Sequence, residues 1–362
     1  MIPLYKPHMP ELPELNKILN SGALAYGEYS RQFESDLSAF VKMDKRILVT
    51  NSFNMAIAVA TSLLDIKAGD EVIASPMACL ASTQPFAANG INVRWADVNP
   101  HTGTLCPDDV KKRITAKTKA IVHNHFCGYP GYIDEINAIG KEFGIPVIDD
   151  GIEAFGSEYK GNKIGNCGTD FTIFSFNAVR IPNTIDGGAL IVRDETLLKK
   201  AEMIRDCGID RSIFRDDIGE ISPMCDITLT GHSATMSNVN AYIGKCQMEC
   251  MDSILESQRK QADIWKIELQ GRTDIEIMGR DEITPNYWVF GILAKKKRDT
   301  ILEFRNRGWY ASGVHINNNI YSIFGKQGFL PGVEEFYSNF VALPCGWWIQ
   351  EEEINGKKNE NF

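Results

Sequence analysis

Short apolar segments alternate with helical segments through the first half of the chain. The apolar segments are rich in valine and isoleucine, whereas the segments between them place apolar residues at the spacing of a helix that packs on one face. This alternation predicts a mostly parallel sheet with helices on both faces, because each helix returns the chain to the end where the next strand starts. The predicted strands are 46–49, 71–74, 93–98, 120–123, 145–149, 171–176 and 189–192, and the predicted helices are 31–42, 53–64 and 133–143.

The pattern changes after residue 243. There the sequence predicts a long helix over about 236–269, a strand at 287–293, a helix near 300–307 and a strand at 311–316. This mixture is typical of an α+β region. We therefore expect a large domain over 1–245 and a smaller C-terminal domain over 246–362, with a frayed polar tail at 355–362.

Composition and charge exclude several classes of function. The 362 residues carry a formal net charge of −9 and give a pI near 5.3, so a general nucleic-acid or anionic-membrane surface is not expected. No apolar run approaches the roughly 20 residues of a membrane span, and the first residues lack the apolar core of a signal peptide. Nine cysteines without a C-x-x-C pair indicate reduced thiols, and hence a cytoplasmic protein.

The histidines do not predict a metal site. His123 and His125 are the only close pair, and they alternate along a predicted strand or its end. No cysteine or carboxylate cluster joins them, so we expect packing and hydrogen bonding rather than metal binding.

A strand runs into a helix at Thr50–Ala56. Ser52 and Asn54 are good N-cap residue types, and a helix N-terminus is also a ready anion site. The segment is therefore compatible with a phosphate site, although alone it is more typical of a plain helix cap.

Two further segments place polar residues after strands. Asp149 and Asp150 end an apolar strand, where a carboxylate either holds a protonated ring nitrogen or caps the next helix. Ser175 also follows a strand, and the double glycine at 187–188 restarts the next one after a turn-rich loop. The hydroxyl is suited to a phosphate oxygen, and the glycines allow close backbone approach or positive φ; the alternative is a long hairpin-like connection.

In this order and spacing, the three segments resemble the sugar aminotransferases of the DegT/StrS family, which are fold type I enzymes that use pyridoxal 5′-phosphate (PLP). The resemblance covers nearly the whole chain. Further matching segments are Ser21–Gly22, Tyr26–Glu28, Phe33–Glu34, Lys67–Ile73, Asp97–Pro100, Gly128–Pro130, Gly231–Gly244, Val314–Asn318 and Leu343–Trp348. The resemblance implies an α/β large domain with a mostly parallel, seven-stranded central sheet, and a smaller α+β C-terminal domain. It also implies a homodimer whose pockets lie at the interface formed by residues 231–244.

The resemblance also implies a role for individual residues. Asp150 would pair with the pyridine nitrogen of the cofactor, and Ser175 would help to hold its phosphate. The substrate would be a nucleotide-linked keto-deoxy sugar, with glutamate as amino donor. The other implied positions are Ser52, Phe53 and Asn54 at the phosphate, Cys79 at the ring face, Glu153 beside the ring, Ser233 near the neighbouring subunit's phosphate, and His315 and Asn317 on the sugar side.

The largest departure from the family is Arg180, which aligns with the lysine that binds PLP. That lysine bonds covalently to the cofactor and later transfers a proton. Arginine does neither, because its guanidinium stays protonated, although it binds anions well. We therefore expect impaired transamination, with PLP or its amine form, pyridoxamine phosphate (PMP), held without a covalent bond if at all.

Other departures surround the same expected pocket. Phe53 and Asn54 stand where the family has glycine and threonine, Glu153 where it has glutamine or histidine, and Ser233 where many members have asparagine. Three explanations of Arg180 stay open: an engineered lysine replacement, a homologue that has lost transamination and binds a ligand or regulates a partner, and a lysine-independent sugar reaction with a histidine or glutamate as base.

Overall fold

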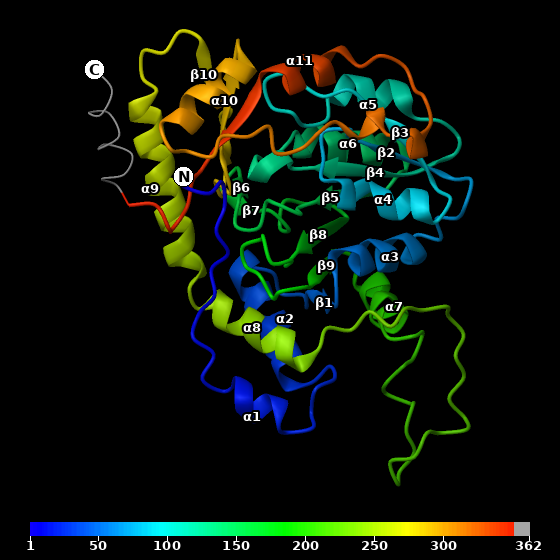
Figure 1. The fold of residues 1–362 in the computed structure, drawn as a ribbon. Coiled ribbons are helices and arrows are strands. Elements are labelled where there is room, and N and C mark those ends of the chain that lie inside the picture. Colours follow the sequence, from blue (N-terminus) through cyan, green and yellow to red (C-terminus); the bar gives the residue numbers. More distant parts are fainter. Residues whose placement is uncertain (351–362) are drawn as a thin grey trace.

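The computed structural model describes residues 1–350, and its centre is a seven-stranded sheet (Figure 1). The strand order is β1-β9-β8-β5-β4-β2-β3. Strands β8, β5, β4, β2 and β3 run parallel, whereas β9 runs antiparallel to both of its neighbours. The predicted mostly parallel sheet of seven strands is therefore confirmed. Its strands are β1 (Leu48–Thr50), β2 (Glu71–Ala74), β3 (Asn92–Trp95), β4 (Thr118–Asn124), β5 (Val147–Asp150), β8 (Phe171–Ser175) and β9 (Gly188–Val192).

Helices cover both faces of this sheet. On one face, α3 packs with α4 and α7; on the other lie α2, α8, α5 and α6. Side chains alternate between the faces along each strand; Ile148, for example, joins the core beneath α3, and Val147 the core beneath α6. The helices are α1 (Leu15–Leu19), α2 (Glu28–Val41), α3 (Phe53–Leu63), α4 (Leu80–Ala88), α5 (Pro107–Arg113), α6 (Ile133–Phe143), α7 (Glu195–Arg205) and α8 (Asn238–Met248).

The C-terminal part of the chain forms a second sheet, β10-β12-β13, beside three helices, and the hairpin β6-β7 pairs with β11 in a third. The 355–362 tail lies outside the described residues, and the division at residue 245 stays a prediction. The elements are α9 (Met251–Glu268), β10 (Ile275–Ile277), β11 (Ile283–Thr284), β12 (Phe290–Ala294), α10 (Lys297–Asn306), α11 (Pro331–Asn339), β13 (Phe340–Leu343), β6 (Glu158–Tyr159) and β7 (Asn162–Lys163), with short 3₁₀ turns at Phe126–Gly128, Asn318–Ile320 and Ser322–Phe324.

Two predicted elements in this part were wrong. The single helix over about 236–269 is two helices, α8 and α9, separated at Glu249–Cys250, where no glycine or proline marks the break. The strand at 311–316 is irregular, apart from one bridge at Ser312, because Val314 turns the backbone to a φ of 58°. This irregular segment carries His315 into the candidate site.

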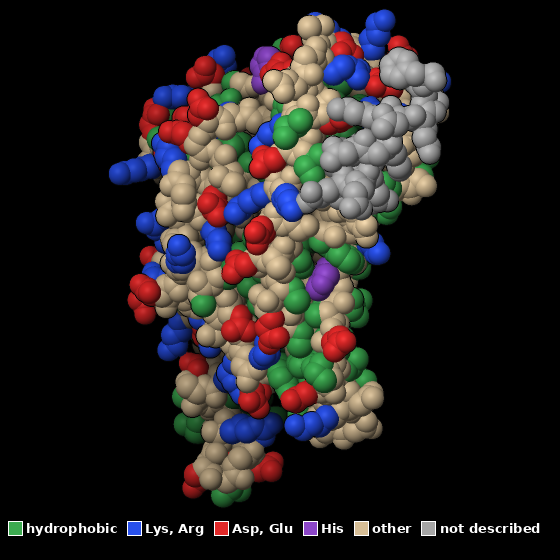
Figure 2. Space-filling view, turned by 90° about the vertical axis from the view of Figure 1, so that its left-hand side faces the viewer, with side chains coloured by type: hydrophobic (Ala, Val, Ile, Leu, Met, Phe, Trp, Pro, Cys, Tyr) green, Lys and Arg blue, Asp and Glu red, His purple; other side chains and the backbone are tan. Residues whose placement is uncertain are grey.

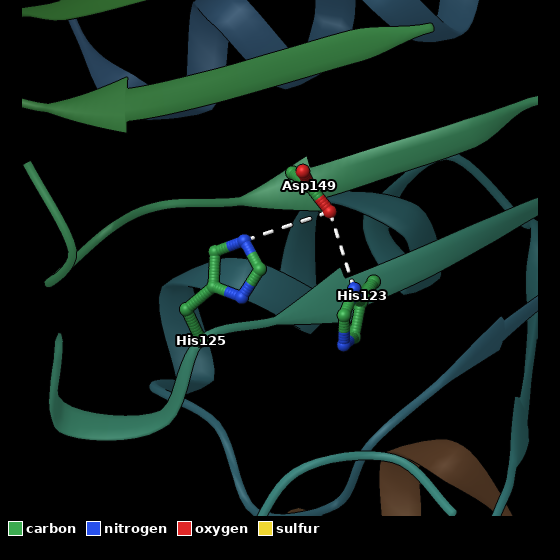
Figure 3. Close-up of side chains that lie close together, drawn as sticks. All are labelled: His123, His125 and Asp149. Carbon is green, nitrogen blue, oxygen red and sulfur yellow. Dashed lines mark hydrogen bonds and ion pairs between the residues drawn. The ribbon is translucent and has the colours of Figure 1, made fainter. Parts of the chain in front are cut away.

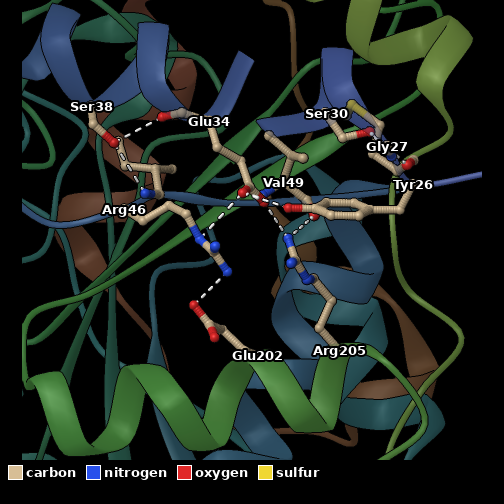
Figure 4. Close-up of polar contacts among 11 residues, drawn as sticks. Tyr26, Gly27, Ser30, Glu34, Ser38, Arg46, Val49, Glu202 and Arg205 are labelled. Atoms are coloured by element: carbon tan, nitrogen blue, oxygen red, sulfur yellow. Dashed lines mark hydrogen bonds and ion pairs between the residues drawn. The ribbon is translucent and has the colours of Figure 1, made fainter. Parts of the chain in front are cut away.

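A buried ion network joins α2 to the first strand and to α7 (Figure 4). The carboxylate of Glu34 is fully buried and accepts hydrogen bonds from the Tyr26 hydroxyl (2.8 Å), the Val49 amide (3.1 Å) and the Arg205 guanidinium. The Arg46 Nε lies 3.3 Å from the same carboxylate. Arg205 also donates to the Val49 carbonyl. The network therefore holds the α2–β1 segment, which leads into the N-terminus of α3.

Within the described residues, no helix is both long and apolar enough to cross a membrane.

Candidate functional site

The predicted polar residues lie together at the carboxyl edge of the central sheet. Thr50 at the end of β1 and Ser175 at the end of β8 both pair with Gly188 of β9. Asp150 ends β5, the neighbour of β8, and shares the sheet face of Ile148, which is the face covered by α3. The Ser52, Asp150 and Ser175 segments are therefore brought to one edge and one face, as the sequence predicted.

Gly188 explains the double glycine in the sequence. A Cβ at this position would lie 2.8 Å from the Phe53 Cα and 2.9 Å from the Ser52 carbonyl oxygen. Glycine is required here for close backbone approach, whereas neither Gly187 nor Gly188 has positive φ. The close approach places the start of α3 against the start of β9, which pairs with Ser175 at the end of β8.

Asp150 is buried, and protein groups satisfy both of its oxygens. The Asn124 side chain donates to Oδ2 (2.8 Å) and the Ile152 amide to Oδ1 (3.1 Å). Burial raises the pKa of this carboxyl above its ordinary value. The arrangement fixes the carboxyl group at the strand end, where it can pair with a cationic ring nitrogen.

The N-terminus of α3 offers donors to an anion. Ser52 is the N-cap residue and accepts from the Met55 amide, while the first amides of a helix have no acceptor within it. Asn54 is exposed, whereas Phe53 packs into the main hydrophobic cluster. The Phe53 side chain therefore occupies the core.

Glu153 is the centre of a second, charged group beside Asp150. Its Oε2 accepts from the Cys127 amide (2.8 Å), and its Oε1 lies 3.1 Å from Arg180 Nη1 and 2.7 Å from His315 Nε2. Arg180 and Glu153 are both buried, and the His315 side chain is 16% exposed. Burial opposes ionisation of Glu153, but the charges of His315 and Arg180 hold its pKa at about 2. Glu153 is therefore a carboxylate at neutral pH.

Arg180 is held from a second side by an aromatic ring. Its guanidinium lies over the Trp288 ring, 4.7 Å from the centroid, and the Trp288 indole N–H donates to the Val179 carbonyl. The Arg180 Nε is buried and has no hydrogen-bond partner among the described residues. The guanidinium is therefore held between Glu153 and Trp288.

Several residues that position this group were not predicted from the sequence. The Asn286 side chain donates to the carbonyls of Glu153 and Phe155. Asn318 bonds to the loop that carries Cys79 through the carbonyls of Pro76 and Ala78, and this contact brings His315 toward the sheet edge. No local signal in the sequence marks Asn286 or Trp288, because their partners are distant in the chain. Asn318 lies in the matching segment Val314–Asn318, but no role was predicted for it.

The remaining predicted residues lie around this group. Cys79 precedes α4, and burial together with the Glu153 charge raises its pKa. The Ser233 carbonyl accepts from the Asn51 side chain, next to the α3 N-terminus. Asn317 is buried and donates to Asn319, so no described contact joins its side chain to Glu153 or Arg180.

His123 and His125 do meet a carboxylate, contrary to the expectation from the sequence (Figure 3). Asp149 Oδ1 lies 3.2 Å from His123 Nδ1 and 3.5 Å from His125 Nε2, and all three residues are buried. The Gly131 amide donates to His125 Nδ1, so a neutral His125 carries its proton on Nε2, which faces Asp149. No lone pair on that nitrogen is then available to a metal. His123 Nδ1 hydrogen-bonds to Asp149, whereas His125 Nε2 is buried near the carboxylate without a hydrogen bond. By strand alternation, Asp149 faces away from Asp150.

No lysine within residues 1–350 forms a hydrogen bond or an ion pair with Asp150, Glu153, Arg180 or His315. Lys160 pairs with Asp134 on the surface, and Lys163 lies over the Phe40 ring. These two lysines, the nearest in sequence before Arg180, are therefore engaged elsewhere.

Comparison with known proteins decides the family. A model of the DegT/DnrJ/EryC1/StrS aminotransferase family matches residues 8–356. The chain belongs to this family. GDP-perosamine synthase of Escherichia coli O157:H7 is 29% identical over 81% of this chain and 78% of the relative. The pleiotropic regulatory protein of Geobacillus stearothermophilus is 26% identical over 96% of this chain and 93% of the relative.

Solved structures agree with the family assignment. The sugar aminotransferase CalS13 from Micromonospora echinospora superposes with a TM-score of 0.92 at 26% identity, and the alignment covers 100% of both chains. The fold is therefore that of a fold type I aminotransferase, as the DegT/StrS resemblance implied.

Proposed function

We propose that this DegT/StrS family member binds a nucleotide-linked keto-deoxy sugar at the carboxyl edge of its central sheet, and that it transaminates poorly or not at all. The observation that carries the proposal is the buried Arg180–Glu153–His315 group beside Asp150. Arg180 follows the end of β8 and stands, on this proposal, in the place of the family's lysine. Membership of a sugar aminotransferase family and the GDP-perosamine synthase relative support the substrate class.

A protein that uses PLP contacts its ring nitrogen, its phosphate and its aldehyde carbon. The residues present fit PLP or PMP at the ring nitrogen and the phosphate. Asp150 suits the ring nitrogen, and Ser52, Ser175 and the first amides of α3 suit the phosphate. The third point, an amine for the aldehyde carbon, is missing, because Arg180 offers a protonated guanidinium paired with Glu153. When bound, the cofactor would supply an electron sink for carbanion chemistry. This chain would contribute the carboxylate at the ring and the donors at the phosphate.

Binding of the sugar is the first testable consequence. At a ligand concentration 100 times its Kd, a nucleotide-linked keto-deoxy sugar should raise the free energy of unfolding by about 2.7 kcal/mol. Thermal shift with a panel of GDP-, dTDP- and UDP-linked 4-keto-6-deoxyhexoses would detect this, and the free nucleoside diphosphates serve as controls. If no nucleotide-linked sugar stabilises the protein more than the free nucleoside diphosphate does, this substrate class is excluded. The relative named as a regulatory protein would then favour a ligand-binding regulatory role.

We also propose a homodimer, and two apolar surfaces support it. The segment 207–235 leaves the body of the molecule after α7 and returns before α8 (Figure 1), and it exposes Ile218 and Met224 by 79% and 87%. It returns beside the site, where Thr235 bridges to Thr50. Hydrophobic side chains also gather on the lower half of the face that Figure 2 shows. In Figure 1, α1 and α8 lie in this lower part of the molecule. A second copy that covered the segment would border the phosphate end of the pocket.

Sedimentation measures the proposed dimer. The unaltered protein should sediment as a dimer at micromolar concentration, and Met224→Asp should shift it toward the monomer by placing a charge in an apolar contact. Phe329→Asp is the matched control, because Phe329 is 76% exposed on another part of the surface. A monomeric unaltered protein, or dissociation by the control alone, would contradict the proposed interface.

A further inference from the structure

Glu153 fixes the tautomer of His315. A carboxylate only accepts hydrogen bonds, so the His315 Nε2 that lies 2.7 Å from Glu153 Oε1 must carry a proton. In neutral His315 the lone pair is therefore on Nδ1. No described residue hydrogen-bonds to Nδ1, and this nitrogen is not among the buried unpaired atoms. The arrangement is that of a carboxylate–histidine pair in which the free nitrogen acts as a base.

Arg180 places a cationic donor beside the same base. Its Nη1 and the His315 Nε2 share one oxygen of Glu153, so both side chains lie at one point of the site. The Arg180 side chain is more than nine-tenths buried, and its Nε has no hydrogen-bond partner among the described residues. The Nε atoms of Arg205, Arg259 and Arg280 are in the same state, so the role of Arg180 follows from its positive charge at this point of the site rather than from the unpaired atom. A guanidinium suits an oxygen that carries negative charge.

We propose that His315 and Arg180 form a proton-transfer site that enolises the keto sugar without using a lysine. This inference rests on the proposed function, because it takes the keto sugar as substrate. His315 Nδ1 removes a proton from the carbon beside the ketone, and the C–H electron pair becomes the carbon–carbon double bond of an enolate. The carbonyl oxygen takes the negative charge, which Arg180 stabilises. Glu153 stays ionised and stabilises the protonated His315.

The reverse step completes the balance. Return of the proton from His315 to the same carbon, on the same face of the sugar, regenerates the ketone. No oxidant, reductant or cofactor is consumed. In D₂O the proton on His315 exchanges with solvent, so each reversal delivers deuterium to the carbon beside the ketone.

The test measures this exchange directly. Protein freed of any PLP with hydroxylamine is incubated in D₂O with a GDP- or dTDP-linked 4-keto-6-deoxyhexose that binds in the panel above. Mass spectrometry and NMR follow deuterium at the carbons beside the ketone, relative to buffer without protein. We expect exchange at least about 100-fold faster than in buffer, and a return to the buffer rate in His315→Gln, because general-base catalysis contributes about 10²–10⁴-fold.

The variants separate catalysis from structure. Gln keeps a donor toward Glu153 but has no basic nitrogen, and retained calorimetric binding of the sugar would show that His315→Gln is folded. His101→Gln is the matched control, because His101 also pairs with a glutamate but has a side chain that is 61% exposed; it should keep the full rate.

Each result is decisive. A sugar that binds the unaltered protein without faster exchange would overturn the inference and leave the proposed function intact. Exchange that persists in folded His315→Gln would place the base elsewhere and also overturn it. Absence of any binding would remove both the proposed function and the inference.

Discussion

Replacing Arg180 by lysine should create covalent binding of PLP where the unaltered protein has none. The side chain at this position reaches Glu153 beside Asp150, and a lysine there would supply the amine that a guanidinium lacks. Arg180→Lys mixed with PLP should gain visible imine absorbance. After borohydride reduction it should keep close to one cofactor per chain, and glutamate should convert bound PLP to PMP in a half-reaction.

Arg193→Lys is the matched control for this gain. Arg193 is exposed and follows the end of β9 opposite to Gly188, so the same replacement there adds a lysine at the other edge of the sheet and should fix no cofactor. Failure of Arg180→Lys to bind PLP would show that another departure excludes the cofactor, and Glu153 would be the first candidate, because it places a negative charge beside Asp150 whereas the Phe53 side chain packs into the core. The ligand-binding alternative would then be favoured over an engineered or recently inactivated enzyme.

Glu34→Ala should cost about 3–5 kcal/mol of folding free energy, because it leaves the Arg205 guanidinium buried without its carboxylate. Arg205 is only 4% exposed, so water cannot replace the lost partner. Urea unfolding measures the loss. Glu34→Gln keeps the side-chain shape and some of the hydrogen bonds, so it should lose less folding free energy than Glu34→Ala. This variant keeps the prediction testable if the alanine variant does not fold.

Glu202→Ala is the control for the ion network. Glu202 pairs with Arg46, and their side chains are 35% and 41% exposed (Figure 4), so its removal should cost no more than about 1 kcal/mol. Equal losses from Glu34→Ala and Glu202→Ala would show that burial of the network does not govern its contribution.

The sequence predicts the central sheet well because its signals are local. A strand such as β5 begins with the β-branched residues Val147 and Ile148 and ends with the polar residues Asp149 and Asp150. Parallel pairing then brings these ends to one edge, so Asp150 and Ser175 could be placed together before any contact was known.

The charged group could be predicted only in part. The family resemblance in the sequence directs attention to Arg180 and Glu153 as predicted departures. Their pairing spans 27 residues, however, and the pairing of Glu153 with His315 spans 162. Trp288, which supports Arg180, bonds to Val179 across 109 residues. No periodicity carries such information. The same reason explains the missed contact of Asp149 with the two histidines, which depends on the register between β4 and β5.

We propose above that the unaltered chain lacks the lysine chemistry of its family. The most direct test is the intact mass of the protein after incubation with PLP and reduction with borohydride, followed by peptide mapping. We expect the mass of the unmodified chain, with any PLP lost on denaturation. A mass increased by one reduced cofactor, mapped to a lysine at the site, would contradict the assignment of Arg180.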